Sequence, residues 1–197
     1  MLKIGITGNI GSGKTTVSKI FELLGIPVFY ADDEAKKVMT ADSILVNELK
    51  STFGGQAYFD DGSLNRKYIA SIVFNNNAEL NKLNAIVHPA VFRAFNTWSE
   101  NYKKAPYVLK EAALLFESGS NKMCDYNIMV QAPLETRIAR VIKRDGLSRE
   151  EIEKRNSYQF SEEKKTQLAN FVIKNDDSEL MIPQVLALHN KFCSLVH

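Results

Sequence analysis

The residues with the clearest chemical signature lie near the start of the chain. Positions 8 to 15 read Gly-Asn-Ile-Gly-Ser-Gly-Lys-Thr, which fits the pattern G-x-x-x-x-G-K-[ST] without exception. Glycines let the backbone close around a phosphate, so that successive N–H groups point inward as an anion nest. Lys14 then supplies a positive charge to the β- and γ-phosphates, and the Thr15 hydroxyl is suited to ligate Mg²⁺. The pattern therefore predicts a loop that binds ATP with Mg²⁺. The residues expected to contact the nucleotide are Gly8, Gly11, Ser12, Gly13, Lys14 and Thr15.

A carboxylate follows the second apolar run of the chain. Asp32 comes directly after Pro27–Tyr30, a run of strand length. In a parallel α/β sheet the ligand lies at the carboxyl edge of the strands, so a carboxylate there can orient and deprotonate an acceptor hydroxyl. A helix N-cap is the competing interpretation. We assign capping to Asp33 and the catalytic role to Asp32.

Three arginines follow the dipeptide Ala132-Pro133, where a helix is predicted to begin. Arg137, Arg140 and Arg144 are spaced i, i+3 and i+7, which places them on one helix face. Phosphoryl transfer spreads negative charge over the equatorial oxygens of its transition state, and guanidinium groups can neutralise that charge. An ordinary solvated helix face is the alternative, and the spacing alone does not decide between the two. The highly charged stretch that follows, residues 145–169, predicts a mobile helical flap.

The elements that would position these residues alternate between strands and helices. Strand-like runs are Leu2–Thr7, Pro27–Tyr30, Tyr107–Lys110, Tyr126–Gln131 and Phe171–Ile173. Such alternation predicts an α/β fold, a P-loop kinase core whose five-stranded parallel sheet is sandwiched by helices. Residues 41–104 contain no strong strand and predict a helical substrate-binding insertion. The expected organisation is thus a core of residues 1–40 and 105–197, the insertion, and a helical lid at 140–169.

Composition sets further limits on function. The chain has 197 residues, 45% of them hydrophobic, with 25 basic and 23 acidic side chains. This length fits one domain with an insertion, and the charge balance gives no reason to expect a nucleic acid or membrane partner. The two cysteines, Cys124 and Cys193, are far apart and predict reduced thiols. With no signal-peptide pattern and no long apolar run, we expect a cytoplasmic protein.

Other classes of P-loop protein fit less well. A GTPase needs a guanine-reading N-K-x-D, but in the nearest match, Asn121–Asp125, the acid falls one residue late. A motor or AAA-type ATPase needs a longer chain and an apolar strand that ends in Asp. A small-molecule kinase needs only a phosphate loop, an acceptor site, a base and mobile arginines, all of which can be found here.

Nearly from end to end, the sequence resembles the dephospho-CoA kinase family. The shared opening, TGxIGSGK followed by LG-x-P-V and an A-D pair, is followed by D-G-x-L-x-R, H-P and L-L-F-E-S-G motifs. In this chain they stand at Thr7–Thr16, Leu24–Val28, Ala31-Asp32, Asp61–Arg66, His88-Pro89 and Leu114–Gly119. Lid and last-strand residues also match, among them Arg155, Gln159, Lys164 and Asn175.

The resemblance implies transfer of the γ-phosphoryl group of ATP to the ribose 3′-hydroxyl of dephospho-CoA, the last step of coenzyme A biosynthesis. It implies that Asp32 is the general base, that Arg66 and His88 lie in the acceptor pocket, and that Thr16 completes the phosphate loop. Arg140 and Arg144 would lie near the nucleotide phosphates. Guanidinium binds phosphate bidentately, which suits Arg66, whereas His88 has an equal alternative as a helix-start residue.

The chain departs from the family pattern at a few positions. Glu111 stands where the family usually has Asp, Asn65 replaces an acid before Arg66, and Asn170 replaces an Asp before the last strand. Two alternative functions stay open, another small P-loop kinase such as a nucleoside monophosphate kinase, and a nucleotide-binding regulator without catalysis. The D-G-x-L-x-R and H-P motifs disfavour the first, and the intact Lys14 and Asp32 disfavour the second. The oligomeric state is not predicted.

Overall fold

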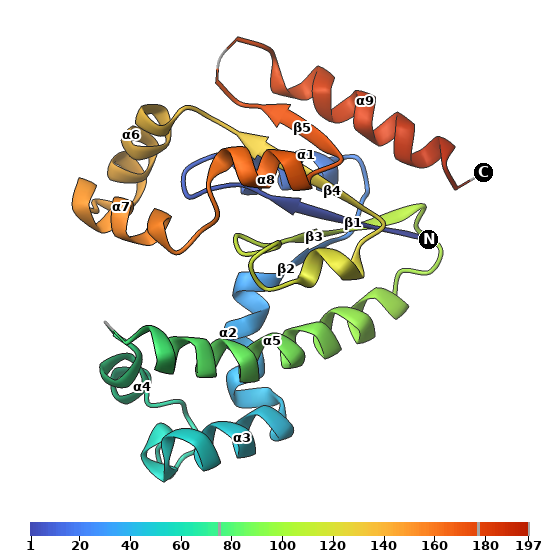
Figure 1. The fold of residues 1–197 in the computed structure, drawn as a ribbon. Helices are drawn as coiled ribbons and strands as arrows, with labels where there is room; N and C mark the ends of the chain where they lie inside the picture. The colour runs from blue at the N-terminus through green and yellow to red at the C-terminus, as the bar shows by residue number, and fades with distance from the viewer. Residues whose placement is uncertain (75, 177, 197) are drawn as a thin grey trace. The chain divides into compact units, whose positions relative to one another are not determined.

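The computed structural model describes residues 1–74, 76–176 and 178–196. The chain divides into two compact units (Figure 1). The first, which we call the core unit, combines Met1–Tyr30 with Ser99–His197. The second, the helical unit, is Ala31–Trp98. It begins about ten residues before the boundary expected from sequence, because a helix starts directly at the end of the second strand.

The core unit is built on a five-stranded sheet in the order β2-β3-β1-β4-β5, and every paired neighbour is parallel. The predicted fold class is therefore confirmed. The strands are β1 (Leu2–Thr7), β2 (Val28–Tyr30), β3 (Tyr107–Glu111), β4 (Tyr126–Gln131) and β5 (Phe171–Lys174). Strand β1 lies in the centre, with β3 and β4 on either side. The loop after β1 therefore leaves the sheet at the middle of its carboxyl edge, where parallel α/β sheets bind their ligands.

One face of the sheet carries an apolar core. Helices α1 (Lys14–Leu23) and α9 (Met181–Ser194) pack against each other there (Figure 1). Fully buried side chains of β1, including Ile4 and Ile6, meet Phe21 of α1 and Phe192 of α9. Burial of each such side chain contributes about 1.5–3 kcal/mol, so this face anchors the helix that follows the phosphate loop.

The remaining helices of the core unit are η2 (Ser120–Met123), α6 (Leu134–Asp145), α7 (Arg149–Ser157) and α8 (Glu162–Leu168). Helix α7 starts with a capping box between Ser148 and Glu151, and Ser161 caps α8. The charged stretch 145–169 was expected to be a flap outside the core. Two of its side chains are nevertheless buried, because Ile152 and Lys165 are 1% and 0% exposed.

The helical unit contains α2 (Ala31–Ala41), α3 (Ser43–Phe53), η1 (Gly55–Ala57), α4 (Arg66–Val73) and most of α5 (Asn77–Glu100). Asp42 caps α3 by accepting from the Leu45 amide, and Asn65 caps α4 by accepting from the Tyr68 amide. An ion pair of 2.8 Å joins Asp42 to Arg93 of α5. Across the described residues, no helix is long and apolar enough to span a membrane.

Candidate active site

The phosphate loop connects β1 to α1 and takes the backbone shape that its glycines permit. Gly11 and Gly13 have φ values of 80° and 90°, in the left-handed region that side-chain-bearing residues rarely adopt. The Ser12 amide donates to the Asn9 carbonyl at 3.0 Å, which tightens the turn. Gly13 is the N-cap of α1, so the loop ends at the positive end of the helix dipole. The geometry is that of an anion-binding turn.

Each motif glycine is also enclosed by a group that leaves no room for a side chain. A methyl group on Gly8 would collide with the Ser12 hydroxyl and lie 2.7 Å from the Val130 carbonyl. On Gly11 it would collide with the carbonyl oxygen of Arg137, and on Gly13 with the side-chain amide of Asn175. The glycines are therefore required by four neighbouring residues, one in the loop itself, one in β4 and two in the segments that follow β4.

Asn175 joins the predicted catalytic arginine to the loop. Its side-chain amide donates to the Ser12 carbonyl at 2.8 Å. The guanidinium of Arg140 in turn donates to the Asn175 carbonyl at 3.1 Å and to its side-chain oxygen at 3.5 Å. Arg140 is thus connected to the loop backbone through a single residue, Asn175, and its catalytic role stays a prediction.

The three arginines of α6 have three different environments. Arg137 is buried and donates to the Ala132 carbonyl at 2.9 Å, to Asn156 Oδ1 at 3.0 Å and to the Ile10 carbonyl at 3.4 Å. Arg144 is exposed and pairs with its neighbour Asp145 at 2.8 Å. A shared phosphate-binding face is therefore the wrong interpretation for Arg137, because its buried guanidinium instead holds the Ile10 carbonyl of the loop. Arg144 keeps its predicted role only as a hypothesis.

Lys14 meets an acid of the neighbouring strand. Its Nζ lies 3.3 Å from Glu111 Oε1, with the two side chains 18% and 7% exposed. The backbone pairing of Ile6 with Glu111 brings this carboxylate to the same edge as the loop. Because both groups are largely shielded from water, their attraction is stronger than that of a surface pair, and it orients the ammonium group at the loop.

The donors near the loop limit what kind of metal it can hold. In the described part of the chain there is no group of three or more His, Cys, Asp and Glu side chains suited to a metal ion. Thr15, the second residue of α1, presents an exposed hydroxyl. One hydroxyl with a carboxylate nearby fits Mg²⁺, which keeps several waters and takes its other ligands from nucleotide phosphates.

The residues predicted for the acceptor belong to the helical unit and come from three of its helices. Asp32 and Arg66 are exposed, in the first turn of α2 and at the first position of α4. One expectation, for Asp33, and one alternative, for His88, are wrong. Asp33 is not a cap, because α2 already begins at Ala31, and its carboxylate pairs with Lys36 at 2.7 Å. His88 does not start a helix, since it lies inside α5, where its ring stacks on Phe92.

Comparison with known proteins identifies the family. The profile of the family described as dephospho-CoA kinase matches residues 2–180. The chain belongs to this family. A dephospho-CoA kinase of Bacteroides fragilis is 41% identical over 187 residues, covering 95% of this chain and 91% of the relative. One from Salinibacter ruber is 41% identical over 178 residues, 89% of each chain.

Solved structures support the same assignment. The protein TT1252 from Thermus thermophilus superposes with a TM-score of 0.82 at 37% identity, covering 96% of each chain. A dephospho-CoA kinase from Campylobacter jejuni gives 0.71 at 25% identity, covering 99% of this chain and 98% of its own. A shikimate kinase from Acinetobacter baumannii, at 0.51 and 18% identity, shares the fold alone. Membership of the dephospho-CoA kinase family makes the chain a kinase that uses ATP, and a nucleoside monophosphate kinase is not favoured.

Two departures from the dephospho-CoA kinase pattern have a structural explanation. Asn65 replaces an acid but still caps α4 through its side-chain oxygen, at 3.1 Å from the Tyr68 amide. Asn170 also replaces an acid, and its side-chain oxygen accepts from the Asn127 amide at 2.8 Å. Both positions need only an acceptor oxygen, which Asn supplies as well as Asp.

Several residues that shape the loop were not assigned a role from sequence. Asn175, Gln159 and Glu117 were visible only as positions where the chain resembles the dephospho-CoA kinase family, and Lys165 was not singled out. The resemblance pointed instead to Lys164, whose ammonium lies 3.4 Å from the centroid of the Phe160 ring. Lys165, the next residue, is the buried one. Only the tertiary contacts distinguish the two lysines.

Proposed function

We propose that this chain transfers the γ-phosphoryl group of ATP to the ribose 3′-hydroxyl of dephospho-CoA, giving CoA and ADP. The match of the dephospho-CoA kinase family to residues 2–180 carries the proposal. The intact phosphate loop, with Lys14 held beside Glu111, supports it. A kinase of this kind works in the cytoplasm, which is where we place the protein.

The triphosphate lies in the loop, where backbone amides and the N-terminus of α1 attract its charge. Lys14 neutralises the β- and γ-phosphates, and Arg140 and Arg144 serve the transferring group. The Thr15 hydroxyl would help to hold Mg²⁺, which would supply further positive charge to the triphosphate. Thr16 extends the loop contacts into the first turn of α1.

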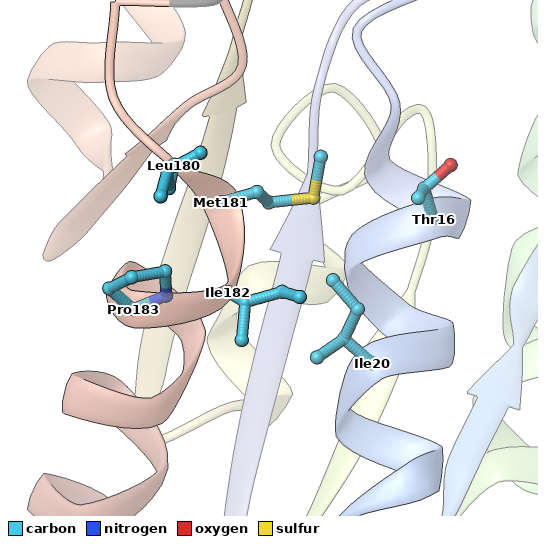
Figure 2. A pocket seen from close by; sticks show the side chains of 6 residues that line it. All are labelled: Thr16, Ile20, Leu180, Met181, Ile182 and Pro183. Atoms are coloured by element: carbon cyan, nitrogen blue, oxygen red, sulfur yellow. The ribbon is translucent and has the colours of Figure 1, made fainter.

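An apolar pocket of about 360 Å³ next to the loop suits the adenine ring of ATP. Thr16 and Ile20 of α1 line one side, and Leu180 to Pro183, at the start of α9, line the other (Figure 2). In Figure 2 the Met181 and Ile20 side chains both extend into the space between the two helices. Because Thr16 is two residues from Lys14, a nucleotide whose phosphates occupy the loop can reach this pocket with its base.

In this proposal the helical unit supplies the residues that bind and activate dephospho-CoA, the phosphoryl acceptor. Asp32 accepts the proton of the 3′-hydroxyl while the hydroxyl oxygen forms a bond to the γ-phosphorus. The bond from that phosphorus to the β–γ bridging oxygen breaks, and ADP leaves. Arg66 binds a phosphate of the acceptor bidentately, and His88 contributes a ring donor.

Acceptor choice tests the proposal. ADP release is followed with ATP, Mg²⁺ and, in turn, dephospho-CoA, AMP, CMP and shikimate, and the phosphorylated product is identified by mass spectrometry. Dephospho-CoA is expected to be the one efficient acceptor of the four, and Lys14→Ala, as the control, removes that activity. Faster turnover with AMP, CMP or shikimate would refute the proposed acceptor.

A further inference from the structure

Ile10, at a position of the loop motif where any residue is allowed, contacts the segment that follows β4 through its amide, its carbonyl and its side chain. Its amide donates to Gln159 Oε1 at 2.9 Å, and its carbonyl accepts from Arg137 at 3.4 Å. Its side chain packs against the small apolar cluster of Ile138, Val141 and Ile152. The outer edge of the phosphate loop therefore belongs to the same packed region as helices α6 and α7.

The neighbouring loop residue makes a second connection to this segment. The side-chain amide of Asn9 donates to the Phe160 carbonyl at 3.0 Å and to Asn156 Oδ1 at 3.3 Å. Asn9 is 1% exposed, so water cannot replace these bonds. Two successive loop residues are thus held by one turn of chain, which runs from the end of α7 to the start of α8.

A buried ion pair holds that turn in place. Lys165 is fully buried, and its ammonium lies 3.0 Å from Glu117 and 2.8 Å from the Ala113 carbonyl. Glu117 Oε1 also accepts from the Phe160 amide at 2.7 Å, while Gln159 donates to the Ala113 carbonyl at 3.4 Å. Burial lowers the pKa of Lys165, and the adjacent Glu117 carboxylate opposes that shift. A buried ammonium is stable only while such partners stay in place, so the turn has one preferred position.

We propose that Gln159, held by the Glu117–Lys165 pair, is a positioning residue that sets the outer edge of the phosphate loop and thereby the affinity for ATP. The proposal rests on the proposed function only in naming ATP as the ligand. The Gln159 side chain makes two hydrogen bonds, one with the Ile10 amide of the loop and one with the Ala113 carbonyl after β3. It shapes the loop before nucleotide arrives, which lowers the ordering cost of binding.

The first test replaces Gln159 and measures steady-state kinetics together with the binding of a non-hydrolysable ATP analogue by calorimetry. Gln159→Leu keeps the approximate size but leaves the Ile10 amide without its acceptor, and is expected to raise the KM for ATP about tenfold. The KM for the acceptor should not change. Gln159→Glu keeps an acceptor oxygen and should restore most of the affinity. Gln167→Leu, the same change at an exposed glutamine of α8, is the control and should behave as wild type.

If Gln159→Leu fails to fold, Gln159→Asn carries the test, because it stays polar but is one methylene too short to reach Ile10. A folded Gln159→Asn or Gln159→Leu protein that binds the analogue as tightly as wild type overturns the proposal, even where its melting temperature is lower. Because calorimetry needs no acceptor, the result stands apart from the acceptor assays. Those assays alone decide whether dephospho-CoA is the substrate.

The role of the ion pair is tested by combination. If Lys165 acts through Gln159, the double variant Gln159→Leu with Lys165→Met should weaken ATP binding no more than the stronger single variant. Multiplied effects of the two changes would show that Lys165 acts independently and would overturn that part of the proposal.

Discussion

The two units of the molecule differ in whether polar side chains are buried. Among the residues that the structure describes, every buried polar or charged side chain lies in the core unit, including Lys110, Glu111, Arg137 and Lys165. The buried side chains of the helical unit are hydrophobic, and Asp32 and Arg66 are exposed. The core unit thus shapes the phosphate loop through a buried polar network. The helical unit has an apolar interior and carries its candidate site residues on its surface. Substitutions in the core unit should therefore change stability, whereas those at the surface of the helical unit should change activity.

The largest effect is expected from Asp32→Asn, which changes chemistry without changing the fold. Removal of a general base should lower kcat by about 10²–10⁴-fold, while ATP binding and melting temperature stay at wild-type values. Asp33→Asn is the matched control, because Asp33 is the adjacent exposed acid and its pair with Lys36 is a surface ion pair of little energetic value. Equal kcat values for the two variants would remove Asp32 from the mechanism.

Lys110, which is buried in β3, should instead affect stability and its dependence on pH. Burial lowers the pKa of Lys110 to about 8, against an ordinary value near 10.5 in the unfolded chain. Between these two values the unfolded state binds more protons, so the free energy of unfolding rises with pH there, by on the order of 3 kcal/mol. Below pH 8 this contribution does not vary.

Urea unfolding at pH 7 and pH 10 measures this rise, and Lys110→Met should lack it. Lys104→Met, at an exposed lysine, serves as the control and should keep the wild-type rise. The same pH dependence in Lys110→Met and wild type would show that burial of this charge carries no cost. The contrast between the units would then be weaker than the burial suggests.

A smaller effect is expected from Arg66→Ala in the helical unit. Loss of a bidentate contact to an acceptor phosphate should raise the KM for dephospho-CoA about 10- to 100-fold, with the KM for ATP unchanged. Lys67→Ala, at the next exposed residue of α4, is the control. A rise in the KM for ATP alone would move Arg66 out of the acceptor pocket.

The smallest expected effect is on the stability of the helical unit. Asn65→Ala removes the cap of α4 and should lower the free energy of unfolding by about 1 kcal/mol, whereas Asn65→Asp should keep it. Denaturant titration of the two variants against wild type measures the difference. If Asn65→Ala is as stable as wild type, caps contribute little to this unit, and its apolar packing carries the stability alone.

Local patterns predicted the strands and the phosphate loop well, because each is specified by residues adjacent in sequence. The expected Tyr107–Lys110 strand is only one residue longer, ending at Glu111, and the β4 strand has the expected bounds. The loop motif can be recognised from its own glycines and the strand before it. Residue type and spacing were sufficient for these elements.

The errors fall where distant residues decide. The burial of Lys165 depends on Ala113, 52 positions earlier, and that of Arg137 depends on Ile10, 127 positions earlier. A charged stretch read alone therefore predicts a flap. Pro89 shows another effect that local sequence does not reveal, because proline usually disrupts the interior of a helix. It is tolerated inside α5 because the helix buries an apolar stripe of Val87, Ala90, Val91 and Phe95, and this burial offsets the missing backbone hydrogen bond.

The hydrogen bond from Asn175 to the Ser12 carbonyl has a consequence for how the protein is made. The two residues are 163 positions apart, so the loop emerges from the ribosome about 10–30 s before the side chain that holds it. A nascent chain shorter than 175 residues has the whole glycine motif but not the amide that completes its shape. The shape of the loop is therefore complete only after the last strand, β5, and the residue that follows it have been synthesised.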